Sequence, residues 1–340
     1  MAVMTERENL LRLLKGETPA WVPRYGSLPN PYAKFPRAMS TVRPGMLSHI
    51  NDSGRQFDIF GVEFVPTKET GGMSLPKPGA FILDDIRKWR DVIKVPDISD
   101  INWEIMAKQD IENGHIDYEN TVVFLGTHTG YFQQLMNFMG FTNGLIAMYE
   151  EPEEVVALYE YLSDFYVEVT KKAVQYYKPD VLCLTDDTAT AKAPFISTEM
   201  YRKLVKPYHA RLAQIGIDNG LYIDMHNCGK CESVIEDWLD FNVGIWNPAQ
   251  VMNDLIGVQK KYGDKLVLAG CWDSSGPVGW PGASEELIRE SVRDVIDTYT
   301  KNGRFLFWGT VMGEIGDTEV ALRQRWVIEE YEAYREMPYK

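Results

Sequence analysis

Long hydrophobic runs and clusters of basic residues are both missing from this sequence of 340 residues. No segment approaches the roughly 18 consecutive apolar residues of a membrane-spanning helix. Lysine and arginine total 35 against 49 aspartates and glutamates, so the formal net charge is -14. Nucleic-acid phosphates are bound by clustered basic residues, and the charge balance therefore argues against a nucleic-acid partner. The N-terminal stretch has no apolar run followed by a small-residue cleavage site, so we expect a cytoplasmic protein with no membrane partner.

Cysteine and histidine are scarce, with four and five residues respectively. Four cysteines in so long a chain do not make a disulfide framework, and grouped cysteines in a reducing compartment more often indicate metal or thiol chemistry. His226, Cys228 and Cys231 nevertheless fall within six residues, where the apolar run in LYIDMHNCGKCESVIEDWL ends. Since composition alone makes such a group improbable, we expect the chemistry of the protein here.

The pattern of apolar segments predicts alternating strands and helices in one large domain, residues 1–340, that opens with a helix over 5–15. Thr5 and Glu8 form a capping box for this helix, and Gly16 ends it. Eight segments then have strand character, most of them followed by a helical stretch: near Trp21 to Tyr25, near Val62 to Pro66, 121–130, 181–189, 221–228, 241–248, 265–273 and 304–312. Eight such units predict an α/β fold, the (β/α)8 TIM barrel.

Two features of the N-terminal third are expected to interrupt that regular pattern. The stretch after Tyr25 is rich in proline and aromatic residues, so it is predicted to be an irregular loop. The segment GGMSLPKPG is predicted to form a surface hairpin or another excursion on the surface. A doubly wound open sheet is the alternative architecture, but no glycine-rich phosphate loop follows the first strand.

In a barrel of this kind the functional residues lie where the strands end. Zinc binds thiolate sulfur and imidazole nitrogen, and a catalytic zinc has three protein ligands and one open position. His226 and Cys228 are two residues apart on an extended segment, so both point to the same side. Cys271, at the end of a nearby strand, is the expected third ligand, with Glu314 or Cys231 as substitutes. The alternative is that Cys271, like Cys183, is an ordinary buried cysteine and that His226 only forms hydrogen bonds.

Other strand ends offer catalytic and substrate-binding side chains. Asp186 and Asp187 follow an apolar strand, so at least one carboxylate is expected to face the mouth; a helix cap or a loop charge is the alternative. His128 is a candidate donor to the substrate or else a structural histidine. The expected substrate-binding residues include aromatic side chains that suit a flat ligand, although a tryptophan at a strand end, taken singly, is more often a core residue. They are Arg24, Tyr25, Asn247, Trp272, Trp308 and Met312.

Several stretches together resemble the uroporphyrinogen decarboxylase superfamily, over nearly the whole chain. They are TERENLLRLLKGETPAWVP, FDIFGVEFVP, PDVLCLTDD with FISTEMYRKLVKPYHARL, MHNCG, VGIWNPAQ and LAGCWD. The resemblance implies a TIM barrel. The decarboxylases of the superfamily carry an arginine-rich first loop that binds porphyrin carboxylates. The corresponding stretch, WVPRYGSLPNPYAKF, has only Arg24, which argues against porphyrinogen decarboxylation.

The His-x-Cys pair resembles the corrinoid-dependent methyltransferase branch, which implies that His226 and Cys228 bind zinc. That branch takes its third ligand from a cysteine after the last strand, where this chain has Thr310. We therefore expect the third ligand to have moved to Cys271 or Glu314. The branch also implies a corrinoid supplied by a separate cobalamin-binding protein, since no Asp-x-His-x-x-Gly signature is present here.

The resemblance leaves the direction of methyl transfer open. The aromatic mouth favours an O-demethylase, in which cobalt(I) of the corrinoid protein takes the methyl group of an aryl methyl ether. Three alternatives remain: a methylcorrinoid:thiol methyltransferase, a uroporphyrinogen-type decarboxylase, and a non-catalytic metal-binding or docking barrel. An oligomer is possible.

Overall fold

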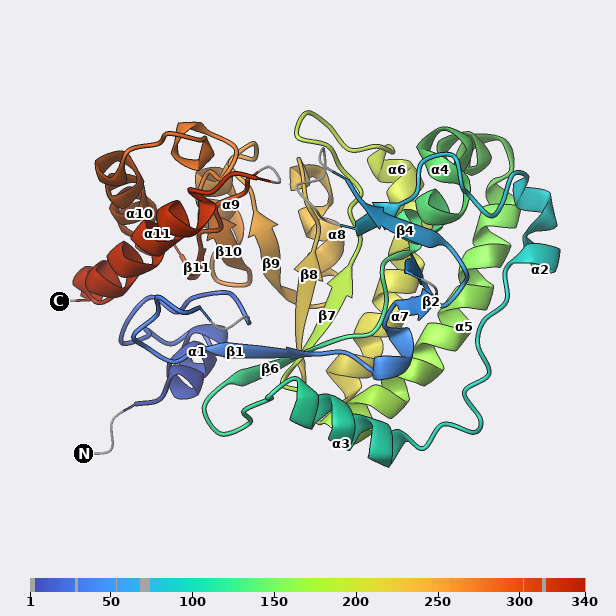
Figure 1. Cartoon of the computed structure of the whole chain (residues 1–340), viewed down its shortest axis with the longest axis horizontal. Helices are drawn as coiled ribbons and strands as arrows, with labels where there is room; N and C mark the ends of the chain where they lie inside the picture. The colour runs from blue at the N-terminus through green and yellow to red at the C-terminus, as the bar shows by residue number, and fades with distance from the viewer. Residues whose placement is uncertain are drawn as a thin grey trace.

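The computed structural model describes residues 4–27, 30–52, 54–67, 74–301, 303–313 and 316–339. Its central element is a curled parallel sheet with the strand order β1-β6-β7-β8-β9-β10-β11 (Figure 1). The strands are β1 Met39–Val42, β6 Val122–Gly126, β7 Val181–Thr185, β8 Tyr222–His226, β9 Val243–Ala249, β10 Val267–Cys271 and β11 Phe305–Trp308. Because every strand runs in the same direction, the carboxyl ends all meet at one edge, where a barrel of this class places its active site.

The segment that precedes β1 extends the sheet beyond β11. Arg24 forms an isolated parallel bridge with Phe307. The N–H of Tyr25 donates to the carbonyl of Phe307 at 2.8 Å, and the N–H of Phe307 donates to the carbonyl of Pro23 at 3.0 Å. Among the described residues no strand ladder joins this segment to β1, so a closed ring of eight strands is not observed. The prediction of a barrel is therefore confirmed in its coarser form, an α/β fold built on a curled parallel sheet.

The inner face of the sheet holds a small apolar core that helix α1 (Glu6–Leu14) closes at the amino end of the strands. Leu10, Leu13 and Leu14 are buried against side chains from β1, β6, β7, β9, β10 and β11. The predicted capping box of this helix is present, since the side chains of Thr5 and Glu8 each accept a hydrogen bond from the other residue's backbone.

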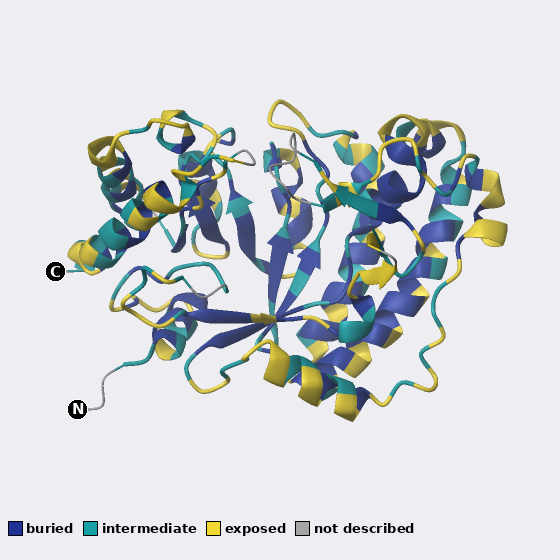
Figure 2. Ribbon diagram, in the orientation of Figure 1, coloured by how far each residue is buried: buried dark blue, intermediate teal, exposed yellow. Residues whose placement is uncertain are grey.

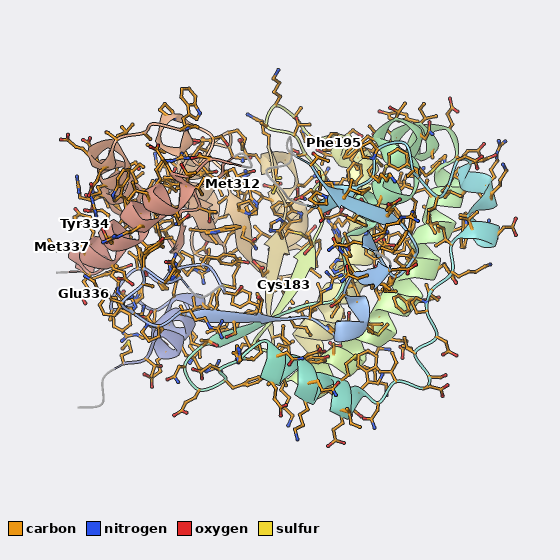
Figure 3. The ribbon with its side chains drawn as sticks, viewed as in Figure 1. Cys183, Phe195, Met312, Tyr334, Glu336 and Met337 are labelled. Atoms are coloured by element: carbon orange, nitrogen blue, oxygen red, sulfur yellow. The ribbon has the colours of Figure 1, made fainter. Side chains whose placement is uncertain are left out.

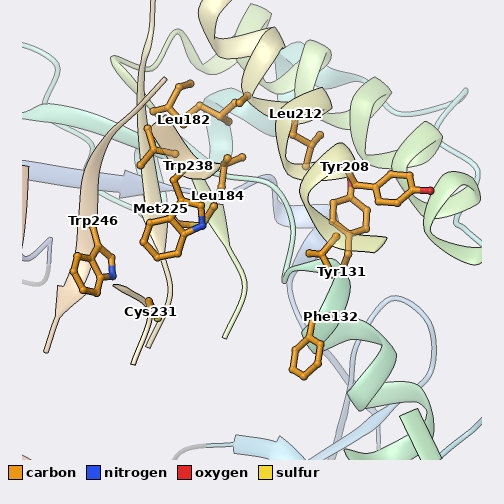
Figure 4. Close-up of a cluster of buried hydrophobic side chains, with 14 of the residues drawn as sticks. Tyr131, Phe132, Leu182, Leu184, Tyr208, Leu212, Met225, Cys231, Trp238 and Trp246 are labelled. Atoms are coloured by element: carbon orange, nitrogen blue, oxygen red, sulfur yellow. The ribbon is translucent and has the colours of Figure 1, made fainter. Parts of the chain in front are cut away.

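A larger core lies between the sheet and the helices outside it, and in Figure 2 the strands and the inward helix faces are buried while the outward faces are exposed. Its helices are α4 Tyr131–Glu150, α5 Pro152–Tyr177, α7 Lys206–Asp218, α8 Ile235–Leu239, α9 Leu255–Tyr262, α10 Glu285–Thr300 and α11 Val320–Tyr334. Figure 4 shows part of this core between β7, β8 and α7. None of the helices in the described ranges is long and apolar enough to cross a membrane.

A second, antiparallel sheet corrects the prediction for the N-terminal third. Its strands are β2 Ile50–Asp52, β3 Arg55–Phe57, β4 Glu63–Pro66 and β5 Ser74–Pro76, in that order. The segment near Val62 to Pro66, predicted as a barrel strand, is β4 of this second sheet. The strand that pairs with β6 in the parallel sheet is instead β1, which lies in the stretch predicted to be a loop. The physical reason is burial: β4 exposes part of its length, whereas parallel barrel strands are covered on both faces.

Remaining connections are short helices. They are α2 Trp89–Val92, α3 Trp103–Asn113 and α6 Thr198–Met200, with 3-10 turns at Gly45–Leu47, Ile86–Lys88, Glu232–Val234, Pro277–Gly279 and Met337–Tyr339 and one π-helical turn at Tyr201–Val205. The connections of the second sheet pack on α4. The N–H of Leu83, after β5, donates to the carbonyl of Phe138, and the ring of Phe60, between β3 and β4, lies 5.3 Å from that of Phe138.

We expect Leu10→Ala to lower the free energy of unfolding by about 2–5 kcal/mol, because truncating a buried leucine loses apolar burial and leaves a cavity. Leu10 is 1% exposed under the inner core. Urea denaturation followed by circular dichroism measures the change. Ile105→Ala is the matched control, since Ile105 lies on α3 and is 54% exposed. Equal losses in the two variants would contradict the role of α1 as the base of the inner core.

Candidate functional site

The turn that follows β8 is hydrogen-bonded to the loop that follows β7. Asn227 accepts a hydrogen bond from the N–H of Thr188 and donates to its hydroxyl, so the turn after His226 is tied to the loop after β7. Gly229 has a φ of +91°, and a Cβ at this position would meet the carbonyl oxygen of Ala189 at 2.5 Å. Only glycine fits there. The turn therefore presents Cys228 toward the loop after β7.

Three potential metal ligands meet at this point: Asp187, His226 and Cys228. One ligand atom from each lies within 4.8 Å of the others, and all three residues are half-buried. His226 Nε2 is 3.7 Å from Cys228 Sγ and 3.8 Å from the Oδ1 of Asp187. The same Oδ1 accepts a hydrogen bond of 2.8 Å from the N–H of Cys228. The described residues contain no other group of this kind.

A chain of hydrogen bonds fixes the ring of His226. Asn247 donates from Nδ2 to both oxygens of Asp224, at 2.7 and 2.8 Å, so its carbonyl oxygen faces the imidazole. That oxygen lies 2.7 Å from His226 Nδ1. Because Nδ1 must then carry the proton, Nε2 is left with its lone pair directed toward Cys228 and Asp187. Tyr25 also donates to Asp224, at 3.3 Å.

Burial dominates the electrostatics of the site. It raises the pKa of Asp224 to about 6, against the opposing effect of its hydrogen bonds from Asn247, Cys183 and Tyr25. Burial, with a contribution from the charge of Asp187, also raises the pKa of the Cys228 thiol above its usual range. A dication would act in the opposite direction, because a coordinated thiol is deprotonated.

The donor set suits zinc. Imidazole nitrogen, thiolate sulfur and carboxylate oxygen are the three kinds of ligand that Zn²⁺ takes, and three protein ligands leave the fourth tetrahedral position open. The hydrogen bond on the far side of the His226 ring has the form usually found behind a metal-binding histidine, where a partner fixes the tautomer. The residues present therefore fit a zinc ion with one free position.

The structure does not bring Cys271, the expected third ligand, together with this group. Strict alternation along β10 would turn Cys271 inward together with Val267 and Ala269. Instead the register of β9 and β10 shifts between Leu268 and Gly270, and Gly270 and Cys271 both have positive φ. The thiol is consequently buried in the outer core, where it lines a cavity with residues of α10.

The two substitute ligands do not join the group either. Cys231 is 1% exposed, and its thiol lies 3.3 Å from Asn227 Oδ1 and 3.2 Å from the carbonyl oxygen of Cys228. Figure 4 shows it within the buried cluster that includes Trp246 and Met225. Glu314 lies outside the described residues.

Asp186 and Asp187 are neighbours with different surroundings. Asp186 is fully buried and accepts hydrogen bonds from the N–H groups of Phe132 and Gln133, in the first turn of α4. His209 Nε2 is 3.1 Å from the same carboxylate. Asp186 therefore caps a helix, whereas Asp187 joins the candidate metal group. Of the two carboxylates, Asp187 is therefore the candidate for the one expected to face the mouth.

The predicted substrate-binding residues are divided between four places. Tyr25 and Trp308, whose rings are 5.1 Å apart, line a cavity of about 440 Å³ that also includes Arg24. Asn247 is buried and bonded to Asp224 and His226. Trp272 lies in the outer core and donates to Ser291 on α10. Met312 is 48% exposed and lies near the carboxyl ends of the strands, away from Cys183 on the inner face (Figure 3).

The roles of Asp224 and Asn247 in orienting His226 were not predicted. A signal for Asp224 was available, because it stands two residues before His226 on the same strand and therefore faces the same side. The predicted role of Asn247, substrate binding, did not include its bond to His226.

Comparison with known proteins adds the family. The family model described as uroporphyrinogen decarboxylase (URO-D) matches residues 71–308. No curated protein matches in sequence. Among solved structures, a methyltransferase from Methanosarcina mazei is 12% identical with a TM-score of 0.59, over 98% of this chain and 99% of that chain. A D-allulose 3-epimerase from Methylomonas sp. is 13% identical with a TM-score of 0.36, over 69% of this chain and 82% of that chain. Because the family match covers well over half of the sequence, the candidate site included, the chain belongs to the uroporphyrinogen decarboxylase family.

Proposed function

We propose that the protein is a methyltransferase that moves a methyl group from an aryl methyl ether to the cobalt(I) of a separate corrinoid protein. The observation that carries this proposal is the convergence of Asp187, His226 and Cys228 at the carboxyl edge of the sheet. The fold shared with the methanogen methyltransferase supports methyl transfer among the chemistries that barrels perform.

A zinc ion bound by Asp187, His226 and Cys228 would supply Lewis acidity to the ether oxygen. This assistance matters because the leaving phenolate has a pKa near ~10 and departs poorly unaided. The methyl carbon is transferred with the electron pair of the C–O bond remaining on the aryl oxygen, while cobalt(I) supplies the pair for the new bond. Tyr25 and Trp308 provide aromatic walls against which a planar ring can pack.

The residues behind His226 serve this chemistry by holding its geometry. The hydrogen bond that Asn247 donates to Asp224 and the one that it accepts from His226 keep Nε2 free of a proton, in the state that binds a metal. Asp187 retains a second oxygen beyond the one that accepts from Cys228. That oxygen can receive the hydrogen bond of a protonated product.

We expect the purified protein to bind one zinc ion. We expect His226→Ala, Cys228→Ser and Asp187→Ala each to lower the affinity for zinc at least about 100-fold. Loss of a residue that only hydrogen-bonds a ligand typically lowers metal affinity about 10- to 100-fold. These variants remove the ligands themselves, so a larger effect is expected. Competition with a chelating dye measures the affinity. Cys271→Ala is the matched control, since that thiol faces α10. Zinc loss in Cys271→Ala equal to that in Cys228→Ser would contradict the proposed ligand set.

We expect Asn247→Leu to weaken zinc about 10- to 100-fold while the three ligands stay in place, because His226 Nδ1 loses its acceptor. The same dye competition measures this, and circular dichroism reports whether the fold is retained. Asn253→Leu serves as a comparison, since Asn253 is also buried but bonds the backbone of Gly229 and Cys231. A similar loss of zinc in both variants would assign the effect to general disturbance of the loop.

For methyl transfer, we expect a cobalt(I) corrinoid protein to be methylated in the presence of a methoxylated aromatic compound, and not with methanol, methylamines or methylated thiols. The visible spectrum of the corrinoid records the reaction. His226→Ala should lower the rate at least about 100-fold, since a lost interaction at the reacting atoms typically costs this much. Methylation of a free thiol by a methylcorrinoid, or release of carbon dioxide from uroporphyrinogen, would instead establish one of the other activities considered for this family.

A further inference from the structure

A second group of polar side chains lies at the carboxyl edge, away from the candidate metal ligands. Arg43 directly follows β1, and His128 comes two residues after β6. The two strands are neighbours, with Val42 opposite Leu125, so these side chains begin from adjacent strand ends. Asp58, from the second sheet, and Tyr166, from α5, complete the group, since the charges of Arg43 and Asp58 both affect the pKa of Tyr166.

Arg43 has a charge with no dedicated partner. Its guanidinium forms no hydrogen bond or ion pair with the residues that the structure describes, and the residue is exposed. Asp58 attracts it at longer range but is already engaged, because it accepts from the N–H groups of Phe60 and Val62 and from the amide of Gln134. An arginine near other side chains that is left without a carboxylate has its planar donor fork free for a ligand.

His128 is likewise without a hydrogen-bond partner among the described residues. It is 5% exposed, and neither ring nitrogen has a hydrogen-bond partner. Burial, together with the neighbouring His209 and the charge of Arg43, lowers the pKa of His128 to about 3, so the ring is neutral. A buried polar group without a partner destabilises a protein by about 1–3 kcal/mol. Such a group in a native structure calls for an explanation, and a bound ligand is one.

We propose that Arg43 and His128 form a subsite for a carboxylate on the substrate, so that the methyl donor is an aromatic acid. This inference rests on the proposed function and narrows its substrate class. Arg43 binds the two carboxylate oxygens through parallel N–H groups, and the neutral imidazole of His128 donates a further hydrogen bond. Arg43 offers one positive charge to the ligand, and the protein as a whole carries a net charge of -14 that repels anions. The subsite therefore suits a carboxylate with one negative charge better than a phosphate with two.

The separation of the two sites suits one aromatic ring. β1 and β8 are three interstrand spacings apart, which amounts to at most about 14 Å along the curled sheet. An arginine side chain and one benzene ring together bridge such a span. A ring held by its carboxylate at Arg43 can therefore direct a methoxy group on its far side toward His226.

Calorimetric titration with 4-methoxybenzoate, 4-methoxybenzyl alcohol and 4-methoxyphenyl phosphate tests the subsite. We expect the acid to bind the wild-type protein at least about 10-fold more tightly than either of the other two. Arg43→Met should lower the affinity for the acid about 10- to 100-fold and the affinity for the alcohol less than about 3-fold, because only the charge-assisted pair is lost. Arg43→Lys should recover part of this affinity, and His128→Phe should weaken the acid more than the alcohol.

Arg55→Met is the matched control, because Arg55 is also exposed but lies on β3 of the second sheet, where it is paired with Glu63. Unchanged binding of the acid in Arg43→Met, equal weakening of acid and alcohol, a preference for the phosphate, or equal effects of Arg43→Met and Arg55→Met would each overturn the subsite. Zinc affinity, measured on the same variants, separates the two proposals. An Arg43-dependent preference for the acid in a protein that binds no zinc would uphold the subsite and refute the metal centre.

Discussion

A buried carboxylate must be hydrogen-bonded, and the way in which Asp224 meets this requirement organises the candidate site. Its side chain is 1% exposed on the inner face of the parallel sheet, where water cannot solvate it. The amide of Asn247 satisfies both oxygens, which fixes the direction of the amide and in turn the tautomer of His226. One constraint at the centre of the sheet thus reaches the edge, where the free nitrogen of His226 faces Cys228 and Asp187.

The same strand periodicity that locates His226 fails at Cys271, and the difference has a local cause. Along β8 the pairing with β7 is continuous from Tyr222 to His226, so Asp224 and His226 share a face even though the register with β9 shifts between Ile223 and Asp224. On β10 the register shift and the two positive φ values at Gly270 and Cys271 reverse the direction of the last side chain. A bulge of this kind depends on how two strands pair, which a single sequence does not reveal. The pair His226 and Cys228 was therefore predictable from spacing, whereas the third member of the group, Asp187, required the folded chain.

The fold was predictable where local signals agree with one another. The capping box of α1, the proline that opens α5 and the apolar runs of six parallel strands all indicated the elements that are observed. In the N-terminal third the signals conflict. β1 is only four residues long and follows a proline-rich stretch, and β4 resembles a barrel strand in composition. The choice between them is made by the register of β1 against β6 and by the packing of the second sheet's connections on α4, both of which are tertiary.

Asp186 and Asp187 illustrate why neighbouring acids at a strand end need not share a role. Successive residues point in opposite directions as a strand ends, so one carboxylate turns outward and the other toward the mouth. The outward carboxylate meets the unpaired N–H groups at the start of α4, where negative charge is favourable. Asp186 thereby ties the helix to the sheet. Because this bond fixes the backbone on one side of Asp187 and the bond from Cys228 fixes its side chain, the carboxylate oxygen of Asp187 is held in position within the candidate metal group.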